Sequence, residues 1–119
     1  MRIAVTAKDT FLEADVDPRF GRAAYILLVD PENMQFEVLD NAENVNALKG
    51  AGIQAAGMIS RAGADVLLTG FCGPNAFKTL SAANIDVVSD VAGTVKEALQ
   101  VYQKGGFTRS KGPNAEARW

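Results

Sequence analysis

The chain has 119 residues, a formal net charge of −2, no histidine and one cysteine. This length predicts a single domain, and an apolar content of 48% is enough for a core without a disulfide or a metal. The acidic balance argues against nucleic acid as a partner, because binding to phosphate backbones needs a basic surface. No apolar run approaches the roughly 20 residues of a membrane helix. Since the first residues lead straight into a predicted strand, we expect no signal peptide, no membrane association and a cytoplasmic location.

Three strands are predicted in the first third of the chain. Residues 3–7 form an apolar run without alternation, which is typical of a central strand that is buried on both faces. Residues 8–17 are rich in carboxylates and are expected to form an exposed loop. Residues 25–30 predict the second strand. Residues 35–39 alternate between polar and apolar, which predicts an edge strand, and the short turn between these two strands makes them antiparallel neighbours.

Beyond a polar connection over residues 41–49, predicted strands alternate with predicted helices. Each helix has a recognisable start. These starts are a glycine turn at 50–52, Pro74 at a first helical position, and a capping box of Thr94 and Glu97. The helices are expected to stop near Gly63, Asn84 and Gly105. Short apolar strands are predicted over 66–69 and 85–88.

This order predicts an α/β fold with a five-stranded mixed sheet, one antiparallel strand and helices on both faces. We expect one domain over residues 1–104. Residues 105–119 lack apolar periodicity and contain several glycines, which predicts a flexible C-terminal tail. A solvated tail is the default interpretation, and a lid or a partner-docking segment is the alternative.

The most informative stretch connects the strand at 66–69 to the helix at Pro74. Gly70 and Gly73 make a tight loop that runs into a helix start, so N–H groups and the positive end of the helix dipole face outward. The glycine turn at 50–52 has the same form, and we interpret both turns as facing one anionic ligand beyond the carboxyl ends of the strands. Arg22 offers planar donors to such a ligand. Alternatively, these are ordinary turns and the arginines near Phe20 pair with surface carboxylates.

Three stretches in this order resemble the dinitrogenase iron–molybdenum cofactor biosynthesis family. They are Phe20-Gly21-Arg22-Ala23, Gly50-Ala51-Gly52-Ile53-Gln54-Ala55-Ala56 and Thr69-Gly70-Phe71-Cys72-Gly73-Pro74-Asn75-Ala76. The resemblance extends to about Tyr102. It implies a ribonuclease H-like three-layer fold and the binding of metal–sulfur cofactors or their precursors. For the branch that this chain matches, it implies a molybdenum–copper sulfide cluster without a covalent tether.

The candidate cofactor-binding residues lie in and beside these stretches. They are Phe20, Gly21, Arg22, Lys49, Gly50, Ala51, Gly52, Ile53, Thr69, Gly70, Phe71, Cys72, Gly73, Pro74 and Asn75.

Members of the family often carry a histidine just before the 50–52 turn, where this chain has Leu48-Lys49. Histidine ligation is therefore excluded, and two modes of binding stay open. Cys72 could ligate a soft metal as a thiolate, or N–H groups, Arg and Lys charges and apolar contacts could hold a thiometallate anion. One cysteine cannot hold a conventional iron–sulfur cluster, so we favour non-covalent binding with Cys72 near by. A purely structural, buried Cys72 is the third interpretation.

These features predict a carrier or scaffold and no enzyme. Without histidine, a Ser-His or Cys-His pair cannot form. The first strand has no carboxylate for a magnesium-dependent nuclease, and no P-loop is present. We expect the bound species to be a metal–sulfur cluster, or thiomolybdate and copper, with an acceptor protein or an ATPase as a further partner. The alternatives are a regulatory protein-interaction module without a cluster and a phosphate- or nucleotide-binding domain.

Overall fold

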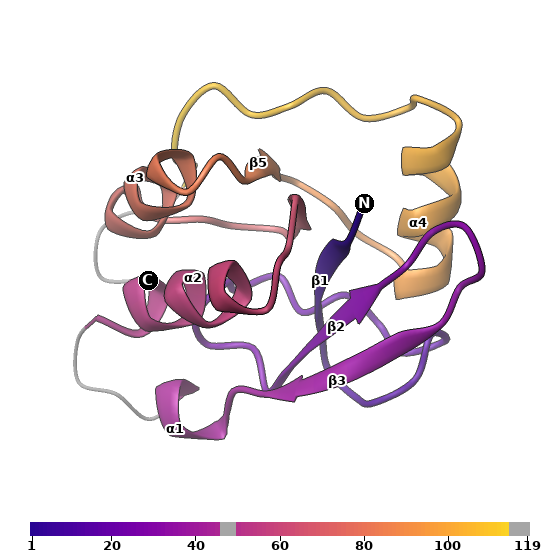
Figure 1. Ribbon diagram of the computed structural model, residues 1–119, viewed down its shortest axis with the longest axis horizontal. Helices are drawn as coiled ribbons and strands as arrows, with labels where there is room; N and C mark the ends of the chain where they lie inside the picture. The colour runs from indigo at the N-terminus through magenta and orange to yellow at the C-terminus, as the bar shows by residue number, and fades with distance from the viewer. Residues whose placement is uncertain (46–49, 115–119) are drawn as a thin grey trace.

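The computed structural model describes residues 1–45 and 50–114 (Figure 1). Its strands are β1 (Ile3–Ala7), β2 (Tyr25–Val29), β3 (Phe36–Asp40), β4 (Val66–Leu68) and β5 (Asp86–Val88). Its helices are α1 (Ala42–Val45), α2 (Ala51–Arg61), α3 (Pro74–Ala82) and α4 (Val95–Gln103).

The strands form one five-stranded sheet in the order β3-β2-β1-β4-β5. Strand β2 runs antiparallel to both β1 and β3, whereas β1, β4 and β5 are parallel. Val5 lies in register with Leu27 on one side and Leu68 on the other, and all five residues of β1 are buried. The predicted mixed sheet, its single antiparallel strand and its buried central strand are therefore confirmed.

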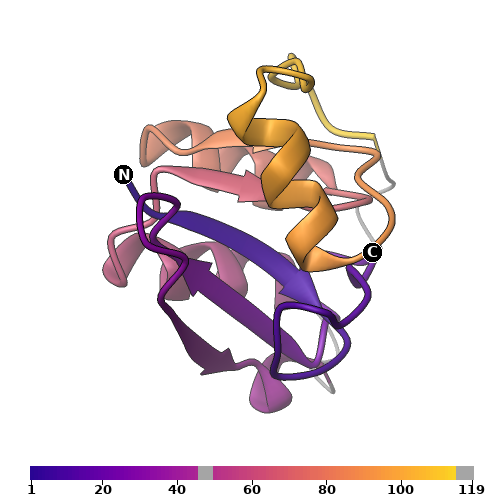
Figure 2. The ribbon, with the colours of Figure 1, turned by 90° about the vertical axis from the view of Figure 1, so that its right-hand side faces the viewer.

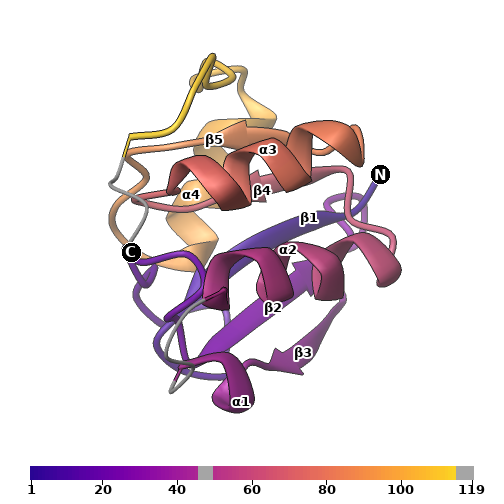
Figure 3. The same ribbon diagram turned by 90° about the vertical axis from the view of Figure 1, so that its left-hand side faces the viewer.

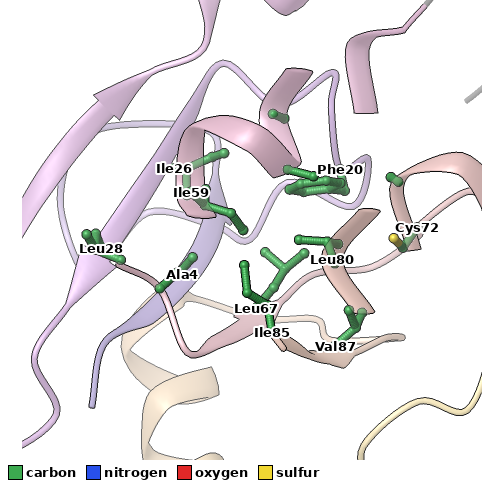
Figure 4. Packing of buried hydrophobic residues seen from close by; sticks show 14 residues of the cluster. Ala4, Phe20, Ile26, Leu28, Ile59, Leu67, Cys72, Leu80, Ile85 and Val87 are labelled. Carbon is green, nitrogen blue, oxygen red and sulfur yellow. The ribbon is translucent and has the colours of Figure 1, made fainter. Parts of the chain in front are cut away.

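Helices cover both faces of the sheet, as predicted. Because successive side chains of a strand point to opposite faces, Ala4 packs into a cluster with α2 and α3, and Val5 packs into a cluster with α4. Figure 3 shows α2 and α3 side by side on one face, and Figure 2 shows the orange-yellow α4 on the other. The α2/α3 cluster includes Ile59, Leu80 and Phe20 (Figure 4).

Two loop predictions need correction. The connection over 41–49 is not wholly irregular, because its first part forms α1, whose Ala42 N–H donates to Asp40 Oδ1 at 2.9 Å. The stretch over 8–17 is not wholly exposed either. Val16 is 6% exposed and packs into the α4 cluster, and Asp17 is 7% exposed. Apolar burial draws this end of the loop onto the sheet.

The longest helix among the described residues is α2, with 11 residues. No helix over residues 1–45 and 50–114 has the length and apolar character needed to cross a membrane.

Candidate functional site

The carboxyl ends of β1 and β4 are joined by buried hydroxyl groups. Thr6 Oγ1 donates to the carbonyl of Asp17 at 2.6 Å, and the Oγ1 atoms of Thr6 and Thr69 lie 2.9 Å apart. A hydroxyl has one proton to donate, so Thr69 is the donor in the second bond. Thr69, a predicted site residue, is fully buried, and its side chain anchors the loop that follows it.

The loop between β4 and α3 lies against the segment that carries Phe20. Phe71 N–H donates to the carbonyl of Pro18 at 2.5 Å, and Phe20 N–H donates to the carbonyl of Phe71 at 3.1 Å. A Cβ on Gly70 would lie 2.7 Å from Pro18 Cα. Glycine is therefore required at this position for the two segments to approach so closely.

All three predicted stretches pack directly against one another, with no room for a further side chain between them. Gly21 has a φ of +91°, and a Cβ there would lie 2.8 Å from Gly52 Cα. A Cβ on Gly52 would in turn lie 2.9 Å from Ala76 Cβ. Gly21 therefore packs on the first turn of α2, and the first turn of α2 packs on the first turn of α3.

The N-termini of α2 and α3 consequently lie side by side (Figure 3). Gly50 and Gly73 occupy the N-cap positions, so neither helix has a side-chain cap, and neither has an acidic residue in its first turn. Among the described residues, the first bonds within these helices are donated by Gln54 to Gly50 at 3.0 Å and by Phe77 to Gly73 at 2.9 Å. The earlier N–H groups have no partner within their helices.

Helix α4 is built differently. Thr94 Oγ1 accepts from Glu97 N–H at 3.1 Å, and Glu97 Oε1 accepts from Thr94 N–H at 3.0 Å, which is the predicted capping box. These bonds hold the pKa of Glu97 below its ordinary value. The N-terminus of α4 is thus capped by side chains, whereas the adjacent N-termini of α2 and α3 are not.

Apolar side chains flank these N-termini. Ile53, in the first turn of α2, is 44% exposed, and Phe71, in the β4–α3 loop, is 36% exposed. Phe20 differs from both, because it is 2% exposed and packs in the α2/α3 cluster (Figure 4). Its side chain contributes to the core.

Cys72 is fully buried in the same cluster. Burial raises the pKa of its thiol to about 12, so the thiol is protonated at neutral pH. Its sulfur contacts the carbonyl of Gly73 at 3.8 Å. Over residues 1–45 and 50–114, no group of three or more Cys, Asp or Glu side chains could hold a metal ion.

The positively charged residues near the candidate site differ in their surroundings. Arg19 Nε lies 4.0 Å from Asp17 Oδ1, so this arginine pairs with a carboxylate as the alternative interpretation predicts. Arg22 is partly buried and follows Gly21 directly. Lys49 lies outside the described residues.

Sequence reasoning missed two asparagines that organise this edge. Asn41, which is 1% exposed, donates through Nδ2 to the carbonyls of Gly21 at 3.0 Å and Ala23 at 2.8 Å. Asn114 Oδ1 accepts from Cys72 N–H at 2.8 Å. Neither has a local sequence signal, since each acts on a segment far away in the chain.

A five-stranded mixed sheet with three glycine loops packed together at its carboxyl edge defines the class of the molecule, a small α/β domain with paired helix N-termini. Comparison with known proteins then gives its family. The chain belongs to the dinitrogenase iron–molybdenum cofactor family, whose model matches residues 1–105. The resemblance seen in the sequence is thereby confirmed.

Solved structures agree with this assignment. The chain is 46% identical to the orange protein of Desulfovibrio gigas in its apo form, with 96% of each chain covered and a TM-score of 0.94. It is 30% identical to a NifB-like protein from Thermotoga, with 97% of each chain covered and a TM-score of 0.82. A dinitrogenase-like protein from Methanocaldococcus jannaschii, 14% identical, shares the fold with a TM-score of 0.72 over 95% of this chain and 97% of its own. No curated protein matches the chain.

Proposed function

We propose that this protein binds and carries an anionic metal–sulfur cluster of the molybdenum–copper sulfide type, without a covalent bond, at the carboxyl edge of its sheet. One observation carries the proposal, which is the contact between the N-termini of α2 and α3, neither of which has a side-chain cap or an acidic first turn. Two positive dipole ends at one place attract an anion, and backbone N–H groups are ready donors to it.

The groups present suit a thiometallate better than a ligated metal. A sulfide-rich anion accepts N–H donors and tolerates apolar neighbours, and Ile53 and Phe71 supply such neighbours. A protonated, buried Cys72 is a poor ligand, because the thiolate is the form that binds metal. We therefore assign the holding role to the first-turn N–H groups of α2 and α3, with Arg22 and Lys49 as the cations. When bound, the cluster would supply molybdenum, copper and sulfide for delivery.

Further parts of the proposal concern the protein as a whole. We infer a carrier without catalytic activity, located in the cytoplasm, that takes up thiomolybdate and copper and passes the product to an acceptor protein or works with an ATPase. The family description names an iron–molybdenum cofactor, and the orange protein was solved in an apo form, both of which support a cofactor-related role. The strand order β3-β2-β1-β4-β5 supports a ribonuclease H-like description of the fold.

The deciding experiment is the metal and labile-sulfide content of anaerobically purified protein, together with its visible spectrum. Colourless protein is then titrated with tetrathiomolybdate and copper(I). Stoichiometric molybdenum, copper and sulfide with charge-transfer absorption supports the proposal. Absence of metal and of uptake contradicts it and favours a protein-interaction module, whereas uptake of phosphate or nucleotide alone favours the phosphate-binding alternative.

A further inference from the structure

The segment that follows α4 returns to the candidate site. After Gly105, the chain crosses the molecule past β5 toward the β4–α3 loop (Figure 1, yellow trace). Phe107 packs against the α4 cluster, and Ser110 N–H donates to the carbonyl of Val87 at 2.7 Å. Ser110 Oγ accepts from Ser89 N–H at 3.0 Å and bonds with Ser89 Oγ at 2.9 Å. This segment is therefore anchored beside β5 through both backbone and side chain.

The segment reaches the β4–α3 loop through Asn114. Its Oδ1 accepts from Cys72 N–H at 2.8 Å, and its own N–H donates to the carbonyl of Cys72 at 3.0 Å. Its Nδ2 donates to the carbonyl of Gly70 at 2.9 Å and to Asp90 Oδ1 at 3.2 Å. One residue thus makes three hydrogen bonds to the backbone of residues 70–72 in this loop.

These bonds complete a strand-like arrangement. On its other side, the loop bonds through both backbone groups of Phe71 to the segment that holds Pro18 and Phe20. Successive backbone groups of residues 70–72 therefore point alternately to two neighbours, as in the middle strand of a sheet. On this side the Gly70 carbonyl also accepts from Asp90 N–H at 2.8 Å, so Asn114 and Asp90 together take the place of the second neighbouring strand.

We infer that Asn114 is a positioning residue of the candidate site, and that residues 107–114 act as a strap that fixes the β4–α3 loop and, through it, the N-terminus of α3. What that N-terminus binds rests on the proposed function. Because the N–H groups of Phe71 and Cys72 are used by Pro18 and Asn114, the loop does not donate them to a ligand. We assign the donors on this side to the first turn of α3, which the strap holds in place.

The test uses the full-length chain without ligand and exploits the single cysteine. We expect Asn114→Ala to raise the rate of thiol labelling at Cys72 about tenfold, the effect of losing the part-buried hydrogen bonds from its side chain to the loop. The amide NMR signals of Asn75 and Ala76 should shift in the same variant. Ser110→Ala, which loosens the strap without touching the loop, should give a smaller change of the same kind.

Thr94→Ala is the matched control, because it removes a cap on the opposite face and lowers global stability without touching the strap. If it accelerates labelling as much as Asn114→Ala does, the protection of Cys72 reflects global unfolding and the strap is refuted. Unshifted Asn75 and Ala76 amides in Asn114→Ala refute the positioning role.

Affinity for a cluster assembled from tetrathiomolybdate and copper(I) is measured separately, at a temperature where every variant is folded. We expect it to fall about tenfold in Asn114→Ala and to stay unchanged in Thr94→Ala. An unchanged affinity in Asn114→Ala would overturn the positioning role. A wild-type protein that binds no cluster would refute the proposed function instead, while the labelling rates and amide signals still decide the inference about Asn114.

Discussion

Gly21 is the residue at which the first loop meets the two helices. It combines a φ of +91° with a Cβ position 2.8 Å from the backbone of Gly52. We expect Gly21→Ala to lower the free energy of unfolding by about 2–5 kcal/mol, the sum of left-handed strain and overpacking. Urea denaturation measures this change. In Gly50→Ala, with a φ of +78° and no atom of the described residues nearer than 4.0 Å to the added Cβ, only the strain of about 1–2 kcal/mol should remain. Equal losses in the two variants would mean that Gly21 and Gly52 do not touch.

Cys72 should make the stability depend on pH in the alkaline range. Burial raises the pKa of its thiol from 9.0 to about 12. As pH rises above 9, the unfolded chain releases this proton and the folded chain keeps it, so the free energy of unfolding falls. The stabilisation is complete below pH 9 and is lost progressively between pH 9 and 12.

Cys72→Ala isolates this dependence from that of other groups. The difference in free energy of unfolding between wild type and variant should shrink from pH 8 to pH 10, measured by urea denaturation under reducing conditions. Parallel pH profiles would instead indicate an accessible thiol with an ordinary pKa, and a difference that grows as pH rises toward 9 would indicate an ionised thiol. Thiolate ligation would regain support in either case.

At the scale of elements, the proposed site depends on the first turn of α3. Asn75 is exposed in that turn, which has no acidic residue. Asn75→Asp should stabilise the helix by about 0.3–1 kcal/mol through its dipole, and should also repel an anion bound there. We expect a rise in thermal stability without ligand and a loss of cluster uptake. Asn33→Asp makes the same change of charge in the turn between β2 and β3, and should leave uptake unchanged. If Asn75→Asp takes up the cluster as well as the wild type does, the α3 N-terminus is not part of the site.

The starts of the long helices could be predicted because each depends on neighbouring residues. Pro74 at a first helical position and the Thr94–Glu97 capping box are both confirmed. Asn84, with a φ of +60°, ends α3 in the left-handed conformation as expected. Such features need only a few consecutive residues, so the sequence alone is enough.

Other features depend on segments that are distant in the chain. The burial of Cys72 follows from packing among α2, α3 and Phe20, which no local pattern encodes. Asn114 bonds to residues more than 40 positions earlier, and its surroundings of Gly112 and Pro113 favoured a tail. The glycine turn at Gly52 does lie against the first turn of α3, and that both turns face one anionic ligand stays a prediction. The role of the strap could not be predicted from local sequence patterns.

At the scale of the whole molecule, ligand binding should be visible as folding stability. The chain carries a net charge of −2, so its overall charge does not attract an anion, and the α2 and α3 N-termini supply a local positive potential. A ligand that binds the folded state alone adds about 2.7 kcal/mol at a concentration of 100 times its Kd. For a domain of this size, we expect tetrathiomolybdate with copper(I) to raise the melting temperature by about 8–15 °C.

Salt and a competing anion show what kind of binding causes this rise. If helix dipoles and Arg22 hold the anion, the difference in affinity between wild type and Arg22→Ala should be largest at low salt, because screening shortens the range of charge interactions to about 10 Å at 0.1 M. Differential scanning calorimetry of both proteins in 20 mM and 500 mM sodium chloride measures this difference as a difference in the ligand-induced rise of the melting temperature. A rise in melting temperature that salt leaves unchanged in both proteins would contradict electrostatic retention.

Inorganic phosphate tests whether the site prefers a thiometallate. N–H donors and helix dipoles favour an oxyanion as readily as a thiometallate, so selectivity must come from the exposed Ile53 and Phe71, which favour the softer, less hydrated anion. An equal rise in melting temperature with inorganic phosphate would therefore assign the paired N-termini to phosphate.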